Sequence, residues 1–240
     1  MTMVLGLVVA SCNDDADRTT KLSSEEQAEL VASSMGQSGF AAAGEETADQ
    51  ASEASASSRA AQCGYTSDGS VSLSGTIGSI VYSYMFSYDV QMNCNASQEP
   101  ENFESDFTYE GSIESSRLET QFAGDGSLTV TRLGDAEANF ELDGSYNREG
   151  SFKTKVGQQS SGSSVIHIGI NNVMVRKSDN KIIDGSATVS VSGTISGRGS
   201  YSFDAFVTFH SDGTATIAVD GDMYVMVLAT GQVTLQNNNQ

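Results

Sequence analysis

The sequence is poor in basic residues, in histidine and in tryptophan, and these shortages exclude whole classes of function. Twelve Lys and Arg stand against 31 Asp and Glu, which gives a formal net charge of -19. A phosphate backbone is bound through a basic stripe of side chains, so nucleic acid is excluded as a partner. The chain has two His and no Trp, so it has few side chains that could form a clustered metal site or an aromatic sugar-binding surface. The sequence therefore predicts no cofactor and no metal.

Catalytic motifs are also missing. The chain has no G-x-S-x-G elbow, no His-x-x-x-His pair and no glycine-rich phosphate loop ahead of a helix. His167 or His210 could act as a general base for one of the many serines. We interpret His167 instead as a core residue of a strand and His210 as a turn residue. The expectation is a protein that is not an enzyme, with a hydrolase of unknown type as the third hypothesis.

Proline occurs once and glycine 24 times, a composition typical of short strands joined by glycine turns. In "IVYSYMFSYDVQMNC" every even position from Ile80 to Cys94 is apolar or aromatic, which predicts a long strand with one solvent-exposed face. Such alternation recurs and gives about ten to twelve strands between Ser70 and Gln236. The predicted fold class is all-β, an antiparallel meander closing into a barrel or a two-layer sandwich.

Two features concern the order of the strands. Segments starting at Val165 and Met223 are apolar on both faces, which predicts two central strands. "VSLSGTI" at Val71 and "VSVSGTI" at Val189 differ at one residue. This similarity is explained either by a duplication of half of the domain or by convergence of two amphipathic strands.

Four related phrases begin with Asp-Gly. They are "DGSVSL", "DGSLTV", "DGSATV" and "DGTATI", starting at Asp68, Asp125, Asp184 and Asp212. Asp-Gly accepts the positive φ of tight turns, and apolar residues follow three and five places after the Asp. Each phrase therefore predicts a hairpin corner.

The N-terminal stretch "MTMVLGLVVASC" is a short apolar run that ends in small residues before Cys12, as in a secretory signal. Val9-Ala10-Ser11-Cys12 resembles the lipobox of bacterial lipoproteins. The resemblance implies a signal peptide at 1–11, a lipid on the Cys12 sulfur and attachment to the membrane through that lipid. Asn13 follows the Cys, where Asp resembles an inner-membrane retention signal. An outer-membrane anchor is therefore expected, with the protein periplasmic or surface-exposed.

Residues 12–62 are expected to form an acidic tether, and residues 63–240 the antiparallel β domain. The tether holds one predicted helix at about 23–35, because Ser23 or Ser24 can cap it and Gly36 can end it. Residues 41–61 are mainly Ala, Ser, Gly, Glu and Gln without a bulky aliphatic side chain, so we expect no independent folding there.

The remaining cysteines predict a disulfide. If Cys12 carries lipid, Cys63 and Cys94 are left as a pair, and an exported compartment lets them oxidise.

Two candidate sites follow from the strand pattern. One strand carries an outward row of carboxylates, predicted as a cation or partner face: Glu104, Asp106, Glu110 and Glu114. Inward aromatic residues would line an apolar cavity if one exists: Tyr82, Tyr84, Phe86, Tyr88, Tyr201 and Phe203.

The leading hypothesis is a lipid-anchored cell-envelope protein whose non-catalytic β domain is a binding or structural module for an envelope protein. The alternative is a carrier of an apolar small molecule in the interior of the β domain. The sequence leaves the oligomeric state open.

Overall fold

The computed structural model describes residues 21–36, 39–56, 63–134 and 138–236. This part of the chain forms two helices, α1 (Ser24–Met35) and α2 (Phe40–Ala56), followed by eleven strands. The strands are β1 (Thr66–Ile77), β2 (Ile80–Cys94), β3 (Pro100–Glu114), β4 (Leu118–Thr131), β5 (Asn139–Thr154), β6 (Ser161–Arg176), β7 (Lys181–Ile195), β8 (Gly199–Phe209), β9 (Thr214–Val219), β10 (Asp222–Val227) and β11 (Gln232–Leu235).

The strands form one antiparallel meander in which each strand pairs with its neighbours in sequence. The predicted fold class and strand number are confirmed. The sheet curls strongly without closing into a barrel, since β1 and β11 are its two edges among the described strands. A two-layer description is also compatible with this shape. α1 contacts β5 and β9 to β11, while α2 contacts β3, β4 and β7.

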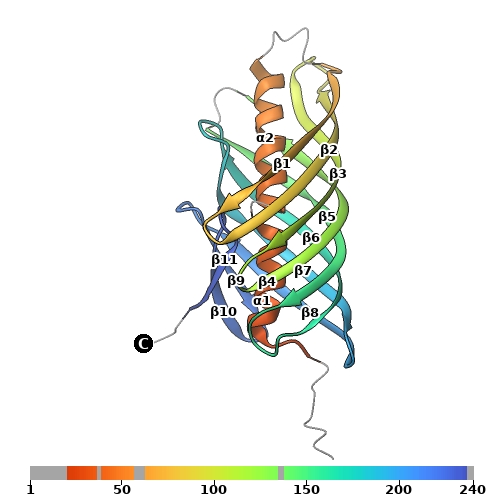
Figure 1. Ribbon diagram of the computed structural model, residues 1–240. Coiled ribbons are helices and arrows are strands. Elements are labelled where there is room, and N and C mark those ends of the chain that lie inside the picture. The colour runs from red at the N-terminus through yellow and green to blue at the C-terminus, as the bar shows by residue number, and fades with distance from the viewer. Residues whose placement is uncertain (1–20, 37–38, 57–62, 135–137, 237–240) are drawn as a thin grey trace, which may run out of the picture.

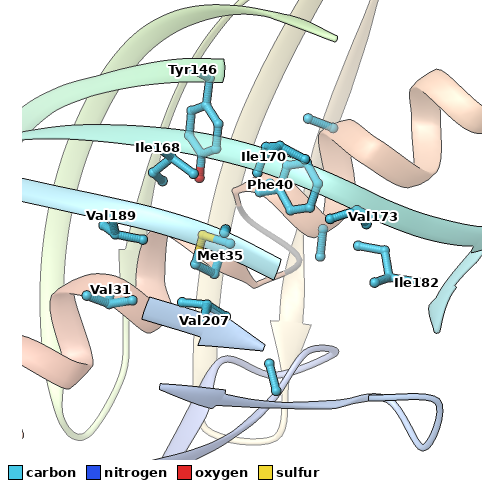
Figure 2. Packing of buried hydrophobic residues seen from close by; sticks show 14 of the residues in the cluster. Val31, Met35, Phe40, Tyr146, Ile168, Ile170, Val173, Ile182, Val189 and Val207 are labelled. Atoms are coloured by element: carbon cyan, nitrogen blue, oxygen red, sulfur yellow. The ribbon is translucent and has the colours of Figure 1, made fainter. Parts of the chain in front are cut away.

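Both helices run through the inside of the curled sheet (Figure 1). All residues of α1 from Glu26 to Met35 are buried. The inward side chains of the strands complete the core, and Figure 2 shows Met35 and Phe40 among the inward valines and isoleucines of β6, β7 and β8. The apolar face of the alternating strands thus points inward, toward the helices.

The helix predicted at about 23–35 is confirmed, but its place in a tether needs correction, as does the expectation for 41–61. Those residues lie largely in α2, whose buried side includes Ala41, Ala48 and Ala51. A segment without bulky aliphatic residues cannot build its own core, but here the sheet supplies the apolar surface. Small alanines then let the helix backbone approach the strands closely.

The buried carboxylate of Glu26 fixes the start of α1. Its Oε1 accepts hydrogen bonds from Thr154 Oγ1 at 2.7 Å and the Ser160 backbone N–H at 2.8 Å, while Oε2 accepts from the Ser23 N–H at 2.9 Å and the Ser23 hydroxyl at 3.2 Å. Burial alone would raise the pKa of Glu26, but these hydrogen bonds outweigh it and hold the pKa below its ordinary value. The capping box of α1 therefore also ties the helix to the turn between β5 and β6.

The other end of α1 is held by two inward side chains of β5. Arg148 Nη1 donates to the carbonyl of Ser33 at 2.6 Å, and the Tyr146 hydroxyl donates to the carbonyl of Ser34. Carbonyls in the last turn of a helix lack intrahelical partners and attract positive charge. The Arg148 guanidinium is buried and also stacks on the Phe122 ring at 3.9 Å.

Three of the four Asp-Gly phrases are not hairpin corners, so that prediction is wrong for them. Asp68, Asp125 and Asp184 lie inside β1, β4 and β7, and only Asp212 lies in a turn. The glycine at 126 shows the reason, because an added Cβ would come within 2.4 Å of the Tyr146 Cβ. This glycine makes room for an inward aromatic side chain of the next strand.

One of the two expected central strands is misplaced. The segment from Val165 lies in β6, the middle of the order, but the segment from Met223 lies in β10, next to the β11 edge. Met223 and Val227 point outward there and are exposed. Apolar residues on both faces therefore identified a central strand in one case and a partly exposed strand in the other.

Candidate functional site

The outer side of β1 to β4 carries a dense group of carboxylates, which we call the acidic face. Its members are exposed residues at outward positions of these strands: Asp68, Asp89, Glu104, Asp106, Glu110, Glu114, Glu119 and Asp125. In the stretch from 66 to 131 there are ten acidic residues and a single basic one, Arg117. Because repulsion between neighbouring carboxylates is relieved by positive charge, this surface attracts cationic groups.

Strand register brings three aspartates into one row. Asp68 of β1 lies directly opposite Asp89 of β2, and Asp89 lies directly opposite Asp106 of β3. Directly opposite side chains on one face of a sheet are close neighbours, and like charges there are destabilising. The row is thus an electrostatic cost that a positively charged ligand would offset.

A trough of about 660 Å³ runs over this row. Asp68, Asp89 and Asp106 line it together with Asp125 and with the small hydroxyl residues of the adjacent row, Ser70, Ser87 and Thr108. The small side chains leave the carboxylates accessible from outside. The trough is open and shallow, which suits an extended or flexible partner.

The only base between 66 and 131 does not neutralise the acidic face. Arg117 follows β3 and turns toward α1, where it pairs with Glu25 at 2.6 Å and with Glu29. Burial raises the pKa of Glu29 despite this pairing, and the two carboxylates raise the pKa of Arg117 against its own desolvation. At the end of β3, Lys155 approaches Glu114 at 3.5 Å.

Within the described residues, no group of three His, Cys, Asp or Glu side chains is close enough to hold a metal ion.

The structure places all four sequence-predicted carboxylates, Glu104, Asp106, Glu110 and Glu114, on the outward side of β3 as expected. Sequence reasoning missed the members on the flanking strands, Asp68, Asp89, Glu119 and Asp125. A period of two shows which side of a strand a residue occupies, but only the pairing register shows which residues lie opposite one another.

The six predicted cavity residues point inward but do not share one cavity. Tyr84, Phe86 and Tyr201 are buried, and Tyr82, Tyr88 and Phe203 are half-buried. Ring contacts link Phe86 to Tyr84, Tyr88 and Phe107 in the wall of β2 and β3. Tyr201 and Phe203 lie apart from them, at a hollow of about 390 Å³ that is also lined by Leu22 and Gln27.

The interpretation was wrong for His167 only, because His210 lies at the turn between β8 and β9 as expected. His167 is exposed on the outer side of β6, so it is not a core residue; its Nδ1 is 2.6 Å from Asn147 Oδ1. Ser190 lies opposite His167 in register, but its hydroxyl donates to Asp204 at 2.7 Å. His210 follows β8, and its Nε2 is 2.8 Å from the Thr216 hydroxyl. His167 and Ser190 thus each form a hydrogen bond with a different partner.

Cys63 and Cys94 form a disulfide with a Cα to Cα distance of 5.5 Å. It joins the residue three positions before β1 to the last residue of β2. Cys12, the predicted lipidation site, lies outside the described residues.

Comparison with known proteins gives no relative, since no family model, no curated protein and no solved structure matches the chain. Neither helix in the described part of the chain has the length and apolar character required of a membrane-spanning helix.

Proposed function

We propose that the protein is a lipid-anchored cell-envelope protein whose β domain is a non-catalytic binding module acting through the outside of its sheet. The observation that carries this proposal is the position of α1 and α2. They occupy the inside of the sheet, where a ligand of a hollow β domain would bind. The acidic face then offers a dense group of exposed carboxylates for a partner.

Two further features support export and anchoring. The Cys63 to Cys94 disulfide suits an oxidising compartment such as the periplasm. The lipobox-like stretch that ends at Cys12 would place a lipid nine residues before Lys21, the first residue of the described part. An outer-membrane location follows from Asn13 under the same proposal.

The proposed ligand of the acidic face is a basic segment of another envelope protein. A four-site variant, Glu104→Gln, Asp106→Asn, Glu110→Gln and Glu114→Gln, removes charge while keeping side-chain shape. We expect wild type to bind polylysine with an affinity that falls as salt rises, and the variant to bind at least about tenfold more weakly, a difference of about 1.4 kcal/mol. Equal binding by wild type and variant would refute a role for this face.

A matched control separates local from general charge effects. Glu149 and Asp204 are exposed outward acids on β5 and β8, outside the acidic face. Neutralising these two should leave polylysine binding nearly unchanged. If they matter as much as the four residues of β3, the attraction arises from the total charge of the protein.

A carrier of an apolar molecule is the second candidate, and the hollow at Tyr201 and Phe203 favours it. β9 pairs only with the second half of β8, from Ala205 to Phe209, so the first half has a free edge beside the start of α1. The volume of the hollow, about 390 Å³, lies within the usual range for small-molecule sites. Native mass spectrometry of freshly purified protein tests this, since a carrier should retain a hydrophobic adduct that Phe203→Glu abolishes.

A further inference from the structure

The first strand of the sheet is an exposed edge of unusual length for a natural protein. β1 spans twelve residues, and among the described strands it pairs with β2 alone. Natural edges are normally blunted by charges, proline, bulges or short length. The opposite edge, β11, has only four residues, but β1 has no proline, no register shift against β2 and one charged residue, Asp68.

The inward side of this edge leaves apolar surface uncovered. Leu73 lies opposite the buried Tyr84 and thus on the inward side, yet 47% of its surface is exposed. Ile77 on the same side is 38% exposed. An added strand beside β1 would cover both side chains.

Two glycines shape the same edge. Gly69 and Gly75 lie opposite Tyr88 and Tyr82, and an added Cβ would come within 2.6 Å and 3.1 Å of the respective tyrosine hydroxyls. The tyrosines of β2 therefore reach across β1 toward its free side. Side chains of an added strand could contact these rings over the glycines.

The edge is also held in place before any partner arrives. The disulfide at Cys63 fixes the chain just ahead of β1, and the Gly64 N–H donates to the Met92 carbonyl at 3.2 Å. Fixing the strand in its pairing geometry lowers the ordering cost of binding.

We propose that β1 accepts an extended basic polypeptide segment as an additional antiparallel strand. The partner alternates apolar and basic residues: the apolar ones pack beside Leu73 and Ile77, and the basic ones lie outward beside Asp68. Asp89 stands in the same row two strand spacings, about 9.6 Å, from the added strand, which is near a Debye length, and Asp106 lies one spacing farther away. Charge thus selects the partner, and the free backbone of β1 binds it.

This inference rests on the proposed function as far as the partner is basic, and adds where and in which conformation it binds. The probe is a fluorescent peptide of alternating Lys and Val with the length of β1, titrated with the full-length protein. We expect saturable binding that weakens with salt. A peptide in which Glu replaces Lys should bind at least about tenfold more weakly.

Backbone methylation tests strand addition directly. In an antiparallel pair, alternate N–H groups of the peptide point toward β1. Methylating the nitrogens of all Val or of all Lys should therefore abolish binding in one peptide and preserve it in the other. If both methylated peptides bind like the parent, or both lose binding equally, strand addition is refuted.

Protein variants locate the site. Leu73→Lys places a charge on the inward side of the exposed edge and should weaken peptide binding at least about tenfold. Val165→Lys is the matched control, because Val165 is also partly exposed, at 38%, but lies on the central strand β6. Equal effects of the two variants would overturn the assignment to β1.

The outcomes separate the two proposals. If the four-site carboxylate variant weakens binding of the Lys and Val peptide while Leu73→Lys and methylation do not, the acidic face binds the peptide and the edge inference fails. If no basic peptide binds, both fail. If size-exclusion chromatography shows a dimer that Leu73→Lys dissociates, a second copy occupies the edge instead of a basic partner, and the inference is overturned.

Discussion

Replacing Glu26 by Gln tests how α1 is held inside the sheet. The two carboxylate oxygens of Glu26 accept four hydrogen bonds, two from β5 and the following turn and two from Ser23. Gln has nearly the same shape, but its amide nitrogen donates and cannot accept. Whichever way the amide is oriented, one pair of donors loses its acceptor.

The size of the effect follows from those contacts. Thr154 can turn its hydroxyl to the Ser160 carbonyl, 3.1 Å away, whereas among the described residues the Ser160 N–H donates to Glu26 alone. Hydrogen bonds to charged groups contribute about 1.5 to 3 kcal/mol each, and a buried donor without a partner costs about 1 to 3 kcal/mol. We expect Glu26→Gln to lower the free energy of unfolding by about 2 to 4 kcal/mol. For a chain of this size, this lowers Tm by roughly 4 to 16 °C.

The pH dependence gives a second test of the same contact. Because the folded-state pKa of Glu26 lies below its ordinary value of 4.5, the stability that it contributes is present above that value. It is lost as the pH falls through the folded-state pKa. The difference in unfolding free energy between wild type and Glu26→Gln should therefore be largest near neutral pH and shrink below about pH 4.5.

Urea unfolding at a series of pH values measures this difference. Glu149→Gln is the control, since Glu149 lies exposed on the outer side of β5 and should show a difference near zero at every pH. A Glu26→Gln variant as stable as wild type at neutral pH would refute the buried network, as would a loss that does not change with pH.

Three further predictions concern covalent links and close packing. Cys63→Ser combined with Cys94→Ser should lower the unfolding free energy by about 3 to 4 kcal/mol for this separation of 31 residues, and non-reducing peptide mapping of exported protein should find the linked peptides. Gly126→Ala should destabilise by about 1 to 3 kcal/mol, because the new methyl group meets Tyr146; an unchanged Tm would contradict the close approach. Cys12→Ser should move the protein from the membrane fraction to the soluble fraction or leave its precursor uncleaved, and a soluble wild type with an unmodified Cys12 would end the anchor proposal.

The sequence was sufficient to predict the strands and the side of the sheet to which each side chain points. Alternation from Ile80 to Cys94 identified β2 almost to the residue, and the four carboxylates of β3 point outward as their even positions required. These features depend on one strand at a time. The row of Asp68, Asp89 and Asp106 depends on the register of three strands, which no single-strand pattern contains.

The prediction that each Asp-Gly phrase marks a hairpin corner failed for a related reason. A glycine in a β sequence suits a turn, but it also suits a position where a neighbouring aromatic ring must lie flat against the backbone. Gly69 beneath the Tyr88 ring and Gly126 beneath the Phe107 ring are of the second kind. The ring belongs to another strand, so the local phrase cannot distinguish the two uses.

The largest omission was the position of the two helices inside the sheet, and β5 carries a signal that would have indicated it. Within "FELDGSYNREGSF" the inward positions include Tyr146 and Arg148, beside Phe140 and Phe152. An inward arginine on a strand needs acceptors inside the fold, and sheet carbonyls are engaged with neighbouring strands. The end of a helix is one of the few structures that offers free carbonyls in a core, and α1 supplies those of Ser33 and Ser34 to β5. A charged residue in register with aromatic core positions is therefore a reason to look for a helix inside the sheet.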